Sequence, residues 1–250
     1  MKETEIVASD QNLFSQKEKN MDQANDKINI FLIGDSTMSQ KDDLNIPERG
    51  WGMVIYQYFD NNIQFHNFAA NGRSTKSFID EGRWKKVLNL LKSGDYVFIQ
   101  FGHNDEKMYD PLRYTHPDKE YRENLKLFVT SSRKCGANPV LMSSICRRNF
   151  DEQGNLLNTH GTYPEAVRKT AEELSVPFID MELKTRKLIL DHGVEDSNKL
   201  FVRIEPGLFE SFPEGLIDNS HLSIYGATLI AGLAVEGIKD LGLAISRNIK

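Results

Sequence analysis

Short apolar runs alternate along this chain with longer segments whose apolar residues recur every three or four positions. The short runs are rich in Val, Ile, Phe and Tyr, which is typical of strands that are buried on both faces. The helical spacing between them predicts amphipathic helices. The expected strands are 28–33, 63–69, 96–101, 139–144 and 177–180, and the expected helices are 52–59, 84–91, 119–134, 163–174 and 223–241.

This alternation of strands and helices predicts an α/β fold with a central, mostly parallel five-stranded sheet covered by helices on both faces. No internal repeat or low-complexity linker divides residues 27–250, so we expect them to form one domain. Residues 1–26 are polar, and we expect a loosely held N-terminal arm. Residues 191–216 are the least regular stretch, and we expect loops near the sheet edge there.

Composition and charge exclude several classes of protein. Of the 250 residues, 39% are hydrophobic and 27% are charged, which suits a globular protein. The net charge of −5 gives no basic footprint for nucleic acid or an anionic membrane. No apolar run approaches the ~18 residues of a membrane span. We therefore expect neither nucleic acid nor a membrane as a partner, and the pattern does not predict an oligomeric state.

The N-terminal residues and the cysteines bear on the cellular compartment. Residues 1–26 lack the apolar core of a signal peptide, so the chain as written is expected to be cytoplasmic. It would be secreted or periplasmic if a signal had already been removed. Cys135 and Cys146 flank an expected strand, whose length would hold the two thiols too far apart for a disulfide.

Polar residues gather just beyond the carboxyl ends of the expected strands. In open α/β sheets this edge is where ligands bind, so these clusters should converge on one rim. The candidates are Asp35 and Ser36 after the first strand, Asn71, Gly72 and Arg73 after the second, His103, Asn104 and Asp105 after the third, Arg147 and Arg148 after the fourth, and Asp218 and His221 before the last helix.

Together these residues supply the parts of a nucleophilic acyl transfer. A serine needs a base to take its proton, and the base needs an acid to orient it. Asp218 precedes His221 by three residues, which on a single turn places a carboxylate beside the imidazole. Backbone N–H groups of Ser36 and Gly72 and the amide of Asn104 could stabilise an oxyanion.

Each residue also has an ordinary structural interpretation. Ser36 and Asp218 could cap helices, Gly72 could serve a turn, and His103 could be a packed histidine. Their coincidence at predicted strand ends, with complementary roles, favours a catalytic site. No cluster has the spacing of metal ligands, so no metal site is expected. Three further histidines are interpreted as structural or solvated: His66, His116 and His192.

Four short motifs carry a family resemblance. The sequence from about residue 28 to 241 resembles the SGNH, or GDSL-type, hydrolases. The motifs are "GDST" at 34–37, "NGRST" at 71–75, "GHND" at 102–105 and "DNSH" at 218–221. This resemblance implies a three-layer α/β/α, flavodoxin-like fold and a serine esterase without a cofactor. By the same resemblance, Ser36 is the nucleophile, His221 the base and Asp218 its partner, with Ser36, Gly72 and Asn104 as oxyanion donors.

More narrowly, the chain is similar to the rhamnogalacturonan acetylesterase branch of that family. This similarity is carried by "GDSTM", "GWG" at 50–52, "GRS" at 72–74 and "FGHND", and extends to the stretch 147–166. It implies removal of O-acetyl groups from a plant cell-wall polysaccharide, with a shallow polar surface for the sugar. The residues considered for that surface are Trp51, Arg73, His103 and Arg147, although Trp51 could equally lie in the core and the arginines could have ordinary surface roles.

Three other functions remain open. The chain could be an esterase or lipase of this fold that acts on another short-acyl ester, a thioester or a lipid. It could be a non-catalytic carbohydrate-binding protein, although the intact Ser36, Asp218 and His221 argue against this. It could bind a phosphate at the 34–37 turn. No Walker lysine or GxGxxG motif follows the first strand, which argues against a nucleotide.

Overall fold

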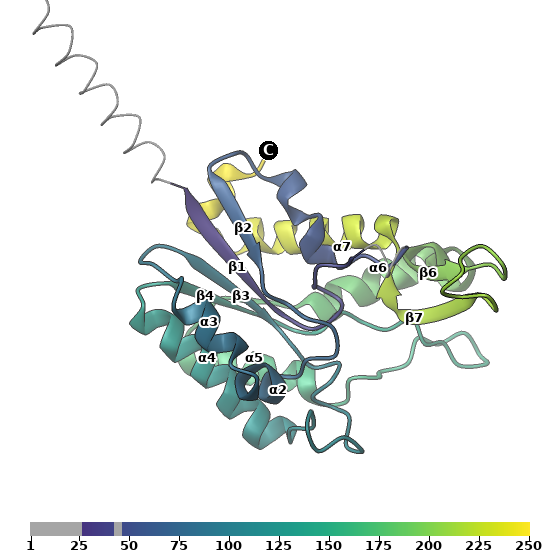
Figure 1. Cartoon of the computed structure of the whole chain (residues 1–250), viewed down its shortest axis with the longest axis horizontal. Coiled ribbons are helices and arrows are strands. Elements are labelled where there is room, and N and C mark those ends of the chain that lie inside the picture. Colours follow the sequence, from purple (N-terminus) through teal and green to yellow (C-terminus); the bar gives the residue numbers. More distant parts are fainter. Residues whose placement is uncertain (1–26, 43–46) are drawn as a thin grey trace, which may run out of the picture.

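The computed structural model describes residues 27–42 and 47–250, so the expected N-terminal arm lies outside the described residues. Its central sheet has the strand order β2-β1-β3-β4-β5, and all four neighbouring pairs are parallel (Figure 1). The five predicted strands and the parallel sheet are confirmed. The strands are β1 (Ile28–Gly34), β2 (Ile63–Asn67), β3 (Tyr96–Gln100), β4 (Asn138–Met142) and β5 (Phe178–Ile179).

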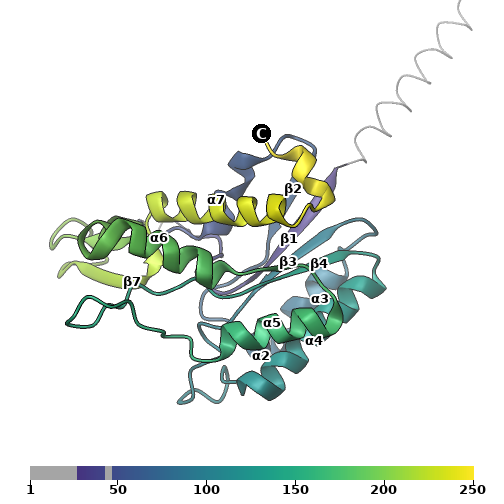
Figure 2. The same ribbon diagram turned by 180° about the vertical axis from the view of Figure 1, so that it is seen from behind.

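Helices cover both faces of this sheet, as Figures 1 and 2 show. The helices are α2 (Thr75–Asp80), α3 (Arg83–Leu88), α4 (Arg122–Lys134), α5 (Tyr163–Leu174), α6 (Met181–Asp196) and α7 (Ile224–Asp240). Alternate residues of β1 join two separate cores, because successive side chains of a strand point to opposite faces. Ile30 and Leu32 join the core under α6 and α7, whereas Phe31 and Ile33 join the core under α2 to α5. The three-layer α/β/α arrangement is confirmed.

Helix boundaries follow local capping signals where these are present. The Ser74 side chain accepts from the Ser77 backbone N–H in a capping box at the start of α2. Ser223 caps α7 by accepting from Gly226, so Asp218 is not the cap of that helix. Shorter helical turns complete the description: Trp51–Met53, Ile55–Tyr58, Ser197–Leu200 and Ala244–Asn248 are 3₁₀, and Pro117–Tyr121 is π-helical.

The helix predicted over 52–59 is wrong in type, because two 3₁₀ turns occupy this stretch. The first turn packs tightly against the loop after β1, where a Cβ on Gly52 would lie 2.5 Å from the Met38 carbonyl oxygen. Because the chain must meet that loop closely, a regular helix is not formed here. Helices α2 and α6 were not predicted.

The prediction of loops over 191–216 is correct only for its second half. Helix α6 continues to Asp196, and the strand β6 (Phe201–Ile204) pairs antiparallel with β7 (Leu216–Leu222). Residues 205–215 have no helix or strand. The β6–β7 pair lies at the end of the sheet toward which the parallel strands run, so it can add residues to the ligand-binding edge (Figure 1).

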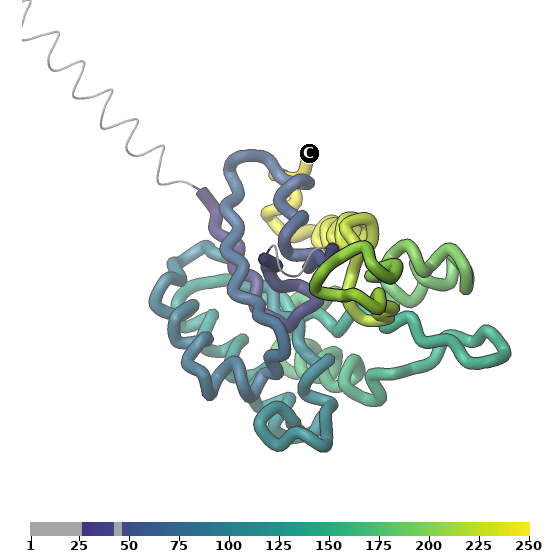
Figure 3. The backbone as a smooth tube through the Cα atoms, turned by 45° about the vertical axis from the view of Figure 1, so that its right-hand side comes forward, coloured from purple at the N-terminus to yellow at the C-terminus, as the bar shows by residue number. Residues whose placement is uncertain are grey.

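Other observations bear on the remaining expectations. Cys135 and Cys146 are unpaired. Within residues 27–42 and 47–250, no helix is long and apolar enough to cross a membrane. The stretch after β4 projects from the body as a loop closed by a bridge between Phe150 and Leu156, and Figure 3 shows it extending outward in teal-green.

Candidate active site

The turn after β1 presents Ser36 at the carboxyl edge of the sheet. The strand ends at Gly34, where a Cβ would lie only 2.5 Å from the Gln100 carbonyl oxygen of β3. Two backbone bonds to the Asp35 carbonyl, from Met38 at 3.3 Å and Ser39 at 3.1 Å, then close the turn. Ser36 is thereby held in a fixed orientation and is 9% exposed.

Ser36 is the first member of a continuous chain of hydrogen bonds. Its Oγ lies 2.9 Å from His221 Nε2, and His221 Nδ1 lies 2.6 Å from Asp218 Oδ2. In this arrangement Nδ1–H donates to the carboxylate and Nε2 accepts from the hydroxyl, as a serine nucleophile with a histidine base requires. The structure thus brings together the three residues that the sequence singled out for acyl transfer.

Asp218 and His221 lie in an irregular part of β7 rather than on the helical turn that we expected. Between the paired positions Phe201–Leu222 and Arg203–Ile217, β6 advances by two residues while β7 advances by five. The additional residues of β7 form a bulge. Within it, Asp218 Oδ1 accepts hydrogen bonds from the backbone N–H groups of Ser220 at 2.7 Å and His221 at 2.9 Å.

Arginines from neighbouring segments hold this bulge in place. Arg203 donates to the Asp218 carbonyl oxygen and, at 2.6 Å, to Asn219 Oδ1. The backbone N–H of Arg148 donates to the Asn219 carbonyl at 2.9 Å. Asp218 and His221 are therefore presented by a constrained loop, which favours a fixed geometry for catalysis.

Electrostatics keep the acid ionised and make the histidine a stronger base. Burial alone would raise the pKa of Asp218, but the hydrogen bond and charge of His221, with the backbone N–H bonds, lower it to about 2. Burial alone would lower the pKa of His221, yet the Asp218 hydrogen bond and the charges of Glu48 and Asp218 raise this pKa above 6.5. Lys41 opposes that rise.

The sequence interpretation missed Glu48 and Lys41. Glu48 Oε1 lies 3.8 Å from His221 Nε2, and the Lys41 ammonium lies 2.5 Å from the same oxygen. The side chain of Lys41 is fully buried. Its ammonium also donates to Asn71 Oδ1 at 2.5 Å, so one buried cation connects the base to the loop that carries Gly72. Neither residue belongs to a recognisable motif, and only the folded chain brings them together.

The predicted oxyanion donors lie on adjoining loops. Gly72 has φ +74°, a left-handed conformation that suits glycine. The amide nitrogen of Asn104 donates to the Arg73 carbonyl at 3.1 Å, and its oxygen accepts from Lys107 at 2.8 Å. An amide nitrogen carries two hydrogens, so this bond leaves one of them for an oxyanion. The roles of Ser36, Gly72 and Asn104 as donors remain predictions.

Two residues that we considered for sugar binding are buried instead. The Trp51 ring is fully buried in the core beneath α7, where Nε1 donates to Gln100 Oε1 at 2.8 Å. His103 is 5% exposed, with Nδ1 3.3 Å from Asp35 Oδ2 and its ring 4.5 Å from that of His160. Neither ring presents a face to a ligand, so both are corrected to structural positions.

The Asp35–His103 pair lies directly under the nucleophile turn. Burial alone would raise the pKa of Asp35, but His103 and two bonds from Thr37 lower this pKa to about 2. Burial is the main cause that lowers the pKa of His103 to about 4, so the imidazole is neutral at pH 7. A buried carboxylate thus fixes the backbone next to Ser36.

The two arginines considered for substrate binding already have partners. Arg73 pairs with Glu81 at 3.0 Å, and Arg147 pairs with Glu106 at 2.5 Å. Glu106 also accepts from His160 at 2.9 Å, a histidine that the sequence analysis did not single out. A uronate on the substrate would compete with these carboxylates, and substrate contacts by Arg73 and Arg147 remain predictions. Among the described residues, no group of three or more His, Cys, Asp or Glu is placed to hold a metal ion.

Comparison with known proteins identifies the family of this chain. Residues 30–233 match the family described as GDSL-like Lipase/Acylhydrolase. The chain belongs to this family. As a GDSL-family member it is a carboxylic ester hydrolase.

Relatives of this GDSL-family chain include two esterases from Bacillus subtilis that align with most of it. It is 41% identical over 222 residues to rhamnogalacturonan acetylesterase RhgT, covering 89% of this chain and 94% of the relative. It is 34% identical to YesY, a probable rhamnogalacturonan acetylesterase, covering 88% of this chain and 96% of YesY. The sequence-level resemblance to the SGNH hydrolases and their acetylesterase branch is confirmed.

Solved structures support the fold of the GDSL-family chain. YxiM from Bacillus subtilis superimposes with a TM-score of 0.71 at 24% identity, over 87% of this chain and 58% of YxiM, so this chain spans little more than half of that protein. A catalytic mutant of Axe2, an acetylxylan esterase from Geobacillus stearothermophilus, gives 0.59 at 16% identity, covering 87% and 95%.

Proposed function

We propose that this chain is a serine esterase that removes O-acetyl groups from rhamnogalacturonan or its oligosaccharides. The observation that carries the proposal is the hydrogen-bonded chain Ser36–His221–Asp218 at the carboxyl edge of the sheet. Its context is a sequence 41% identical to a rhamnogalacturonan acetylesterase over most of both chains. The reaction needs no group beyond these side chains, the backbone donors and water.

In the first half-reaction, His221 Nε2 takes the Ser36 proton while Oγ forms a bond to the acetyl carbonyl carbon. The carbonyl oxygen becomes an oxyanion, which the backbone N–H groups of Ser36 and Gly72 and the amide of Asn104 stabilise. The bond from carbon to the sugar oxygen then breaks. His221 returns its proton to that oxygen, which leaves as the sugar hydroxyl, and Ser36 carries the acetyl group.

In the second half-reaction, water replaces the sugar. His221 takes a proton from the water as its oxygen attacks the acetyl-serine carbonyl, and the same donors hold the second oxyanion. Collapse releases acetate, and the proton on His221 returns to Ser36 Oγ. Asp218 stays ionised throughout, since its pKa of about 2 lies far below neutrality, and it stabilises the imidazolium in both steps.

The surroundings of the catalytic pair favour a short acyl group. Glu48 and Lys41 lie beside His221, and Asn71 adjoins them, so this side of the site is polar and charged. A long alkyl chain needs an extended apolar surface, and these polar and charged groups do not provide one. An acetyl group needs no such surface, and this argues against a lipase. The intact hydrogen-bonded chain argues against a non-catalytic carbohydrate-binding protein.

Acetate release from a panel of substrates tests the proposal. The panel contains acetylated rhamnogalacturonan oligosaccharides, acetylated xylo-oligosaccharides and p-nitrophenyl acetate. We expect the highest kcat/KM among the carbohydrates for rhamnogalacturonan. A higher value for xylan would indicate a different carbohydrate esterase. Activity on p-nitrophenyl acetate with none on either carbohydrate would indicate an esterase for another short-acyl ester or thioester.

A further inference from the structure

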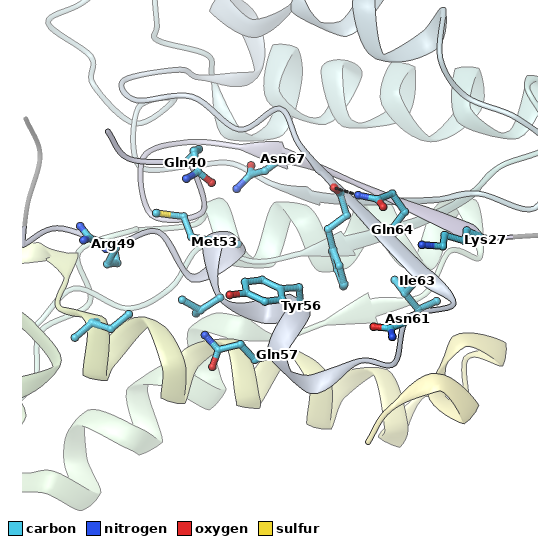
Figure 4. A pocket seen from close by; sticks show the side chains of 14 residues that line it. Lys27, Gln40, Arg49, Met53, Tyr56, Gln57, Asn61, Ile63, Gln64 and Asn67 are labelled. Atoms are coloured by element: carbon cyan, nitrogen blue, oxygen red, sulfur yellow. Dashed lines mark hydrogen bonds between the residues drawn. The ribbon is translucent and has the colours of Figure 1, made fainter. Parts of the chain in front are cut away.

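A cavity of about 840 Å³ lies along the outer edge of the sheet. It is formed by the edge strand β2, the two 3₁₀ turns that precede it and the start of α7 (Figure 4). Neither Ser36 nor His221 lines it. Its volume falls within the range of ~300–1,000 Å³ that is usual for ligand pockets.

The lining of this cavity is suited to a sugar chain that carries carboxylates. Among the described residues that line it none is Asp or Glu, although the whole chain has a net charge of −5. Lys27 and Arg49 supply positive charge, and amides such as Gln40 and Gln64 can both donate to and accept from hydroxyl groups. Tyr56 is 59% exposed and offers an aromatic ring with a polar end.

One end of the cavity adjoins the catalytic residues. Figure 4 shows Gln40 and Arg49 at one end and Lys27 with Asn61 at the other. Arg49 follows Glu48, which lies 3.8 Å from His221 Nε2, and the Arg49 backbone donates to the Leu222 carbonyl at 2.9 Å. A polymer held at Ser36 can therefore continue from this end along β2.

We propose that this cavity is a distal subsite for an acidic oligosaccharide, in which uronate carboxylates meet Lys27 and Arg49 while Tyr56 and the amides contact the sugar rings. The proposal rests on the proposed function, because the acetyl group of the same polymer is placed at Ser36. The subsite adds binding energy far from the reacting bond. It acts on long acidic substrates and not on p-nitrophenyl acetate, which ends near the serine.

The double variant Lys27→Gln/Tyr56→Ala tests the subsite, with Lys187→Gln on α6 as the matched control because its side chain is 74% exposed and outside the cavity. For acetylated rhamnogalacturonan oligosaccharides, we expect the double variant to raise KM by roughly three- to tenfold with little change in kcat. The kcat/KM for p-nitrophenyl acetate should match that of the wild type, which also shows that the variant is folded.

Two comparisons decide the outcome. An unchanged KM for the acidic oligosaccharide in the double variant would overturn the subsite. An equal rise in KM for neutral acetylated xylo-oligosaccharides would overturn its preference for acidic chains.

Calorimetric titration with deacetylated rhamnogalacturonan oligosaccharide measures binding without turnover. If the wild type binds this ligand but releases no acetate from the acetylated form, the proposed function fails while the subsite stands. If the wild type releases acetate but the double variant binds the ligand as tightly as wild type, only the subsite fails.

Discussion

Glu48 places a carboxylate oxygen 3.8 Å from Nε2 of His221, at the end of the imidazole opposite the nitrogen that bonds Asp218. The base is therefore flanked by two acids, of which only Asp218 is in hydrogen-bond contact with the ring. Lys41 lies 2.5 Å from the same oxygen of Glu48 and partly neutralises it. This arrangement predicts that the pair adjusts the pKa of His221 without taking part in the proton transfer.

The variant Glu48→Gln should extend activity to lower pH. His221 must be neutral to accept a proton, so activity is lost as the pH falls through its pKa. The charge of Glu48 helps to raise that pKa above 6.5, and removing the charge lowers it again. The acid limb of kcat/KM against pH should therefore move to lower pH, with the plateau at higher pH less affected.

The reciprocal variant Lys41→Met supplies the control for Glu48→Gln. Lys41 opposes the rise in the pKa of His221, so its removal should move the acid limb to higher pH. A general structural disturbance would lower the plateau of kcat/KM in both variants and leave the midpoint of the acid limb at the same pH. Movement of both midpoints in the same direction would contradict an electrostatic role for the pair.

The variant Asn104→Ala should lower kcat by ~10²–10³ with little change in KM, because an oxyanion donor acts mostly in the transition state. The lost bond to the Arg73 carbonyl should also cost about 1 kcal/mol of stability. Activity and melting temperature are measured on the same preparation. Lys107→Met, which removes a partner of the amide oxygen but keeps the amide, should change kcat far less. Asn104→Ala with a kcat within about threefold of wild type, or ~0.65 kcal/mol, would exclude Asn104 from the mechanism.

The variant Trp51→Phe should lower stability and spare catalysis. It leaves the buried Gln100 Oε1 without its donor, which costs about 1–3 kcal/mol in the free energy of unfolding. Trp84→Phe is the matched control, since Trp84 is also buried and donates to Ser131 at 3.1 Å in the other core. The melting temperature and the KM for acetylated rhamnogalacturonan oligosaccharides are measured for the wild type and both variants. A raised KM with an unchanged melting temperature would instead indicate that Trp51 contacts the sugar.

A series of p-nitrophenyl esters tests the preference for a short acyl group. We expect kcat/KM to fall steeply beyond butyrate, because an esterase for O-acetyl groups needs only a small acyl pocket. Initial rates for acetate, butyrate and octanoate esters at equal enzyme concentration give the comparison. Faster hydrolysis of octanoate than of acetate would support the lipase alternative.

The sheet could be predicted because its strands are buried on both faces and read as nearly continuous apolar runs. The missed elements lack such patterns. Helix α6 leaves Leu183 60% and Leu190 51% exposed, and Gly193 breaks its regular geometry, so no clean apolar face marks it. Strand β7 carries the polar DNSH motif and exposes Ile217, so it does not alternate as a strand should.

The catalytic residues could be predicted because their roles require particular residue types at the strand ends. The groups that support them could not be predicted. Glu48, Lys41 and His160 each contact at least one residue that is distant in the sequence, and no local spacing signals those contacts. The burial of Trp51 and His103 also depends on tertiary packing, since exposed and buried aromatic residues look alike in the sequence.

The central claim is that Ser36 is the nucleophile of an acetylesterase, and acetate release by Ser36→Ala tests it most directly. The measurement compares purified wild type and variant on acetylated rhamnogalacturonan oligosaccharides, with melting temperatures to confirm folding. Removing a triad nucleophile typically lowers kcat by ~10⁴–10⁶. The account predicts a loss of that size in a variant that melts within a few degrees of wild type. A folded Ser36→Ala protein that still releases acetate at nearly the wild-type rate would contradict it.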